Sequence, residues 1–181
     1  MSETTPQLQP IAPNKLALRP HHDLNDRWML LAAGDYAAGE WNAMTISWGA
    51  FGTIWGLPYA QVNVRPQRYT FEFMEAHESF TLCAFPARFR TALEIMGSRS
   101  GRQGDKAAAA GLTPLAAKAV AAPVFAEAEL VLECRKLYSQ PMTLDGMLDA
   151  RARNCYKQSD LHTIYYGEIV EARGVAAYVA G

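Results

Sequence analysis

Residues 64–70 (VRPQRYT) place a proline turn with two arginines between an alternating apolar segment and the expected start of a helix. This order brings guanidinium groups, a hydroxyl and free backbone N–H groups to one place, and the N-terminus of a helix favours anions. Arginine can bind phosphate oxygens in bidentate fashion, at roughly 1.5 to 3 kcal/mol for each charged hydrogen bond. The segment is therefore a candidate phosphate site. The alternative is that Arg65 and Arg68 pair with surface carboxylates while Thr70 caps the helix.

Residues 42–49 (NAMTISWG) alternate as a β-strand does and end in a glycine. Because strand side chains alternate, Thr45 and Ser47 share one face. The opposite, apolar face carries Met44, Ile46 and Trp48. A flavin ring needs this mixture of apolar area and hydrogen-bonding groups, and backbone N–H groups beside Gly49 could approach it closely. The alternative is an ordinary barrel or edge strand with its hydroxyls in water.

A third segment, residues 98–106 (SRSGRQGDK), combines three basic residues with two glycines and two serines. Such a loop could close over a phosphate or an anionic cofactor through Arg102 and Lys106. It could equally be a solvated connector.

Short alternating segments separated by turns dominate the rest of the chain and predict strands. The expected strands are residues 28–33, 41–48, 59–64, 79–85, 124–136 and 161–172. Helices are expected at residues 71–77, 87–96 and 107–120, the first with Thr70 as N-cap and a Tyr69–Met74 hydrophobic staple and the last interrupted at residues 111–114. The elements show no regular strand–helix alternation, which argues against a doubly wound parallel sheet. We expect a mostly β, antiparallel barrel with peripheral helices.

The chain has the length and composition of one globular domain, with 181 residues, 50% of them hydrophobic. Residues 1–26 lack periodicity and predict a partly disordered N-terminal arm, followed by one domain over residues 27–181. The 17 basic and 18 acidic residues give no positive excess for nucleic acid. No run approaches the roughly 20 apolar residues that span a bilayer, and the N-terminus lacks the apolar core of a secretory signal.

The cysteines and histidines suggest no metal site. The cysteines are too far apart for a zinc-like cluster, and their pattern predicts a reducing, cytoplasmic location; they are Cys83, Cys134 and Cys155. The four histidines include no pair at metal-ligand spacing. Dinucleotide-fold, P-loop, zincin and hydrolase-elbow signatures are absent from the sequence.

In order and spacing, five segments together resemble the flavin reductase-like, flavoredoxin-type family. They are NAMTISWG (42–49), VRPQRYT (64–70), SFTLCAF (79–85), SGRQGDK (100–106) and YYGEIV (165–170). The match covers residues 28–172. The resemblance implies a six-stranded split β-barrel of Greek-key type, a homodimer, and FMN held non-covalently near the subunit interface.

The resemblance also assigns roles to residues. Residues 44–49 would line the flavin ring, and Arg65, Arg68 and Thr70 would lie near the phosphate and ribityl end. Residues 83–85 would give backbone contacts, and Arg102 and Lys106 could close the site. The complete set of expected cofactor-binding residues is Asn42, Met44, Thr45, Ile46, Ser47, Trp48, Gly49, Arg65, Arg68, Tyr69, Thr70, Cys83, Ala84, Phe85, Arg102 and Lys106.

The leading hypothesis is an FMN-dependent oxidoreductase of the NAD(P)H:flavin reductase type, passing electrons from a reduced nicotinamide to an acceptor. The cofactor carries that chemistry, so no side chain is nominated as catalytic. One alternative is an FMN-binding electron carrier or sensor with little turnover, which exchanges electrons with a partner protein. Another is a split-barrel interaction module without cofactor. Residues 138–156 carry no recognisable motif and could determine substrate or partner specificity.

Overall fold

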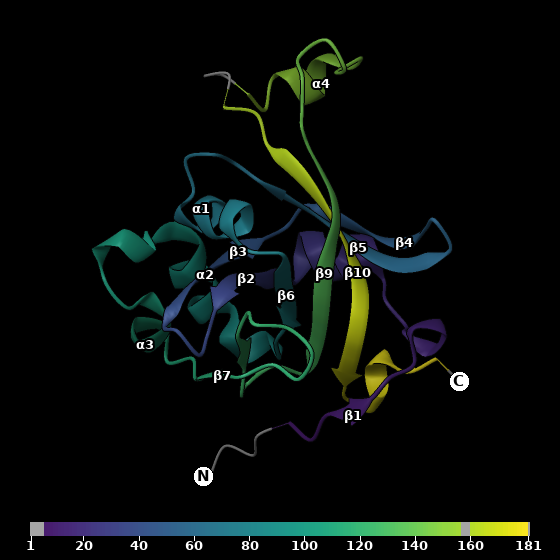
Figure 1. Ribbon diagram of the computed structural model, residues 1–181, viewed down its shortest axis with the longest axis vertical. Coiled ribbons are helices and arrows are strands. Elements are labelled where there is room, and N and C mark those ends of the chain that lie inside the picture. Colours follow the sequence, from purple (N-terminus) through teal and green to yellow (C-terminus); the bar gives the residue numbers. More distant parts are fainter. Residues whose placement is uncertain (1–5, 157–159, 181) are drawn as a thin grey trace.

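The computed structural model describes residues 6–156 and 160–180 (Figure 1). Its centre is an eight-stranded antiparallel sheet in the order β3-β2-β6-β9-β10-β5-β4, with β1 paired to β10. Its strands are β1 (Gln9–Pro10), β2 (Met29–Asp35), β3 (Glu40–Ile46), β4 (Gly49–Ile54), β5 (Leu57–Val64), β6 (Ser79–Ala84), β9 (Leu130–Pro141) and β10 (Thr163–Gly174). A two-stranded sheet is formed by β7 (Pro114–Leu115) and β8 (Val124–Phe125). The expected mostly β, antiparallel fold is confirmed.

In the described residues, four α-helices accompany the strands: α1 (Tyr69–Ala76), α2 (Arg90–Ser98), α3 (Lys106–Ala110) and α4 (Ala150–Arg153). Figure 1 shows α1, α2 and α3 together near β2 and β3, and the β4–β5 hairpin at the opposite end of the sheet. Shorter helical turns are Pro13–Lys15, His22–Asp26, Ala87–Phe89, Gly101–Gln103 and Ala176–Tyr178. No helix in the described part of the chain combines the length and apolar character needed to cross a bilayer.

Strand alternation divides the core into two clusters. Met44 and Ile46 of β3 point into the barrel, where they pack with Met29 and Leu31 of β2. Residues whose side chains point to the other face of these strands, such as Leu30 of β2, belong to a second cluster with residues of α2 and α3. The outward face of β3, which carries Thr45, is therefore covered by helices. The sequence predicted that Met44 and Ile46 lie on one face of this strand and Thr45 on the other, and the structure confirms this for β3.

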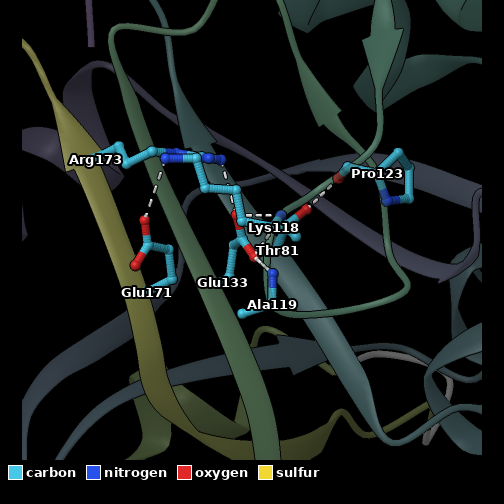
Figure 2. A network of polar contacts seen from close by, with 7 residues as sticks. All are labelled: Thr81, Lys118, Ala119, Pro123, Glu133, Glu171 and Arg173. Atoms are coloured by element: carbon cyan, nitrogen blue, oxygen red, sulfur yellow. Dashed lines mark hydrogen bonds and ion pairs between the residues drawn. The ribbon is translucent and has the colours of Figure 1, made fainter. Parts of the chain in front are cut away.

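The structure differs most from expectation over residues 107–120, where a helix interrupted at residues 111–114 was expected. Only Lys106–Ala110 is helical. The chain then continues through β7 into a loop whose backbone is hydrogen-bonded to a side chain of the main sheet. The buried Glu133 of β9 accepts hydrogen bonds from the backbone N–H groups of Lys118, at 3.0 Å, and Ala119, at 2.5 Å. Arg173 of β10 donates to the same carboxylate at 2.8 Å. Figure 2 shows Glu133 between the loop and Arg173. Gly111 ends α3 in the left-handed conformation, with φ 67°, and the contacts of Glu133 then hold residues 118 and 119 outside a helix despite the helix propensity of the alanines.

Other differences are local. The expected strand 124–136 is divided by a turn into β8, which pairs with β7, and β9, which belongs to the main sheet. Neither β1 nor β4 was predicted, so the main sheet has eight strands rather than six. The N-cap of α1 is Arg68, and Thr70 lies inside the first turn. Residues 6–26 of the expected arm lie along the barrel, where Ile11 and Leu24 are buried. Residues 1–5 lie outside the described residues.

Candidate functional site

Two cationic side chains meet at the C-terminal end of α2. Arg68 Nη2 donates to the carbonyl oxygen of Gly97 at 2.6 Å. Lys106 Nζ donates to the carbonyls of Met96, at 3.1 Å, and Arg99, at 3.3 Å. Carbonyls at a helix C-terminus attract cations. Among the described residues neither cation forms an ion pair with a carboxylate, and the acceptors of their side-chain hydrogen bonds are backbone carbonyls.

Burial and mutual repulsion perturb both groups. Lys106 is only 6% exposed, and burial, with a further contribution from Arg68, lowers the pKa of its ammonium to about 8. Burial also lowers the pKa of the Arg68 guanidinium, and the positive charge of Arg65 adds to this shift. Desolvation and like charges both disfavour the charged forms. An anion bound here would relieve this cost.

The floor of this corner is polar and tightly packed. Asn42 is buried in β3, and its Nδ2 donates to Thr70 Oγ1 of α1 at 2.7 Å. The loop that leads to Lys106 passes directly over it, since a Cβ at Gly101 would lie 2.2 Å from Asn42 Oδ1. A cavity of about 550 Å³ opens here. We call it the anion cavity; its lining includes Lys106, the neutral residues Asn42, Tyr69, Phe73, Gly101 and Gly104, and the acidic residues Glu40 and Asp105.

A second cavity, of about 400 Å³, lies between β3 and α2. We call it the ring cavity; its lining includes Trp28, Thr45, Ile46, Ser47, Leu93 and Gly97. Thr45 Oγ1 donates to the carbonyl of Leu93 at 2.6 Å, and a Cβ at Gly97 would lie 3.2 Å from Thr45 Cβ. The anion and ring cavities are therefore both lined by residues of β3 and α2. Hydroxyls beside apolar side chains suit a planar heterocycle with polar edges.

Trp48 and Gly49 lie beyond the end of β3. Together with Ser47 they line a third cavity of about 550 Å³. The Trp48 ring lies 5.3 Å from the ring of His162, whose Nδ1 is 2.8 Å from the Tyr156 hydroxyl. Burial, with a contribution from Arg65, lowers the pKa of His162 to about 4, so this imidazole is neutral at physiological pH. Sequence reasoning missed this cluster because Trp48 and His162 are far apart in the chain.

Several expected site residues lie elsewhere. Met44 is in the barrel core, and Cys83 and Ala84 are buried in β6. Burial raises the pKa of the Cys83 thiol to about 12, so it stays protonated. Phe85 lines a separate cavity of about 210 Å³. Arg102 pairs with Glu72 and lies over the Tyr69 ring, at the rim of the site.

The contacts of the Arg65 guanidinium differ from those of Arg68 and Lys106 and involve other parts of the chain. Its Nη1 donates to Asp160 at 2.9 Å and its Nη2 to the carbonyl of Cys155 at 3.1 Å. The guanidinium lies over the Tyr156 ring. The structure thus brings Arg68, Thr70, Lys106 and Asn42 together. It directs Arg65 toward residues 138–156 and 160–163 at the outer end of the β9–β10 hairpin, which we call the β9–β10 extension.

Residues 24–178 match the family described as Flavin reductase like domain. The chain belongs to this family. No curated protein matches the sequence significantly. The recognised family agrees with the resemblance read from the five segments.

Several solved structures share the fold of this chain. An FMN-binding domain of flavin reductases-like enzyme from Shewanella baltica OS155 is 17% identical with a TM-score of 0.69, covering 95% of this chain and 79% of that one. Flavoredoxin from Methanosarcina acetivorans is 22% identical with a TM-score of 0.66, covering 84% and 70%. An NADH:FAD oxidoreductase from Streptomyces globisporus C-1027, in complex with NAD and FAD fragments, is 19% identical with a TM-score of 0.60, covering 80% and 72%. This flavin reductase-like chain is a split β-barrel.

Proposed function

We propose that this flavin reductase-like protein binds FMN non-covalently and works as an oxidoreductase of the NAD(P)H:flavin reductase type. The observation that carries the proposal is the pair of cations, Arg68 and Lys106, which carbonyl groups hold without a carboxylate partner in the described residues. A phosphate would supply the missing negative charge. The ring cavity continues from this corner along β3 and α2.

The residues present fit FMN. Arg68 and Lys106 would hold the phosphate, with Asn42 and Thr70 as neutral hydrogen-bonding groups beside it. Thr45 and Ser47 would meet the ring. Bound FMN supplies two-electron chemistry, in which it takes a hydride from NAD(P)H and passes the electron pair to an acceptor. The protein's own contribution is to bind and orient the cofactor and to exclude water from its phosphate end.

Support for a nicotinamide donor comes from the comparison with the Streptomyces oxidoreductase, whose described activity uses NADH. The test is steady-state oxidation of NADH and of NADPH by the purified FMN-loaded protein, with and without added free flavin. We expect turnover with at least one nicotinamide. FMN binding without oxidation of either nicotinamide would contradict the reductase proposal and favour the electron carrier or sensor.

We also propose a homodimer in the cytoplasm. Large exposed apolar side chains on the β4–β5 turn and on the β9–β10 extension favour an interface; they are Trp55, Tyr138, Leu144 and Leu148. The three free cysteines are compatible with a reducing compartment. Light scattering should give twice the chain mass of 19.9 kDa, and the single mass would contradict the dimer.

The charge of Lys106 should make FMN binding depend on pH. Its pKa of about 8 means that the ammonium is present below that pH and is lost above it. We expect FMN affinity to fall between about pH 7 and about pH 9, because the cation facing the phosphate disappears. Riboflavin, which has no phosphate, should show a flatter profile. Isothermal titration of wild type and Lys106→Met should show the fall in wild type only, and an equal fall in both would contradict this role.

A further inference from the structure

Two non-glycine residues in the described chain have a positive φ, and both are tryptophans: Trp28 (66°) and Trp55 (52°). Bulky side chains rarely adopt this region. Trp55 precedes Gly56 in the two-residue turn between β4 and β5, where favoured turns need a positive φ at both positions. Trp28 lies in no such turn. It directly precedes β2, and its conformation needs another explanation.

The chain on both sides of Trp28 is fixed. Arg27 Nη2 donates to the carbonyl of Phe85 and to Glu129 Oε1, both at 2.6 Å, and Arg27 N–H donates to the His22 carbonyl at 3.0 Å. On the other side, Met29 is paired with β3. Strained residues persist where their surroundings over-determine them, and such residues cluster at functional sites.

The constrained backbone places the Trp28 indole at the ring cavity. Its side chain lines this cavity together with Thr45 and Ser47. The guanidinium of Arg90 lies over the indole, with Cζ 3.1 Å from the ring centroid, and Arg90 Nη1 donates to the carbonyl of Asp26 at 2.7 Å. A cation over an indole is an attractive contact that fixes the position of the ring.

We propose that Trp28 is the aromatic wall against which the flavin ring binds, and that Arg90 is a positioning residue that fixes the indole. The inference rests on the proposed function, because it takes the ring to lie beside Thr45 and Ser47. Aromatic rings in contact attract one another beyond their buried area. An indole in contact with a flavin also quenches flavin fluorescence by electron transfer, which gives a readout independent of turnover.

Trp28→Leu and Trp28→Phe test the proposal. Trp28→Leu removes the aromatic face, so we expect FMN and riboflavin affinities to fall by the same factor, about 3- to 10-fold. Trp28→Phe keeps an aromatic face and should retain most of the affinity, but its bound flavin should be more fluorescent. The matched control is Trp55→Leu, which changes the same residue type with a similar backbone conformation in the β4–β5 turn, outside the lining of the ring cavity.

The outcomes separate this inference from the proposed function. Wild-type affinity for both flavins in Trp28→Leu, or a loss confined to FMN, would overturn the role of Trp28 while leaving FMN binding intact. Unchanged flavin fluorescence in Trp28→Phe would also overturn it, and this variant carries the test if Trp28→Leu fails to fold. Failure of the wild type to bind any flavin would overturn the proposed function itself.

Discussion

Arg68→Ala and Lys106→Met should each weaken FMN binding about tenfold to hundredfold, because a hydrogen bond to a charged group contributes about 1.5 to 3 kcal/mol. Both side chains are buried or half-buried and reach the same end of α2. Riboflavin lacks the phosphate, so its affinity should scarcely change. Titration of each variant with both ligands measures the difference directly.

The matched control for this prediction is Arg65→Ala. Arg65 lies three positions before Arg68, but its guanidinium is already paired with Asp160. We expect a smaller loss of FMN affinity than in Arg68→Ala, since only a more distant positive charge is removed. Equal losses for FMN and riboflavin in Arg68→Ala, or no loss in either cation variant, would show that the phosphate lies elsewhere.

Glu133→Ala should lower the free energy of unfolding by about 3 to 5 kcal/mol, the range for removing one partner of a buried ion pair. Glu133 is fully buried, and the change would leave Arg173 without its carboxylate and the N–H groups of Lys118 and Ala119 without acceptors (Figure 2). Urea unfolding followed by circular dichroism measures this loss.

Glu171→Ala is the comparison for Glu133→Ala. Glu171 lies in the same network but is partly exposed, and its carboxylate is 3.8 Å from Lys118 Nζ. Such a pair contributes about 0 to 1 kcal/mol. A loss in Glu133→Ala no larger than that in Glu171→Ala would mean that the loop is not anchored through Glu133.

The fold was largely predictable because its strands are local patterns. Alternation located β2, β3, β5, β6 and β10 to within a few residues. The expected helix was wrong beyond its interruption at residues 111–114, because alanine content reports helix propensity alone, whereas Glu133, distant in the sequence, binds the loop backbone. Thr70 was assigned as the N-cap because its residue type favours capping, but its hydroxyl accepts a hydrogen bond from Asn42 instead.

The site was predictable only as a set of segments. Residues 42–49, 64–70 and 98–106 were singled out by residue type, and the structure brings Asn42, Arg68 and Lys106 from them into one region. The different environments of Arg65 and Arg68 were not predictable, because the partner of Arg65 is Asp160, far along the chain. Trp28 carries no motif, and its significance lies in a backbone conformation that the sequence does not reveal.

The central claim is that this flavin reductase-like chain binds FMN through its phosphate and ring together. The most direct test is titration of the purified, flavin-free protein with FMN, followed by flavin absorbance, with riboflavin and FAD titrated in parallel. We predict saturation at about one FMN per chain, with weaker binding of riboflavin because it lacks the phosphate contacts of Arg68 and Lys106. Absence of uptake of FMN, FAD and riboflavin by the folded protein would contradict the account.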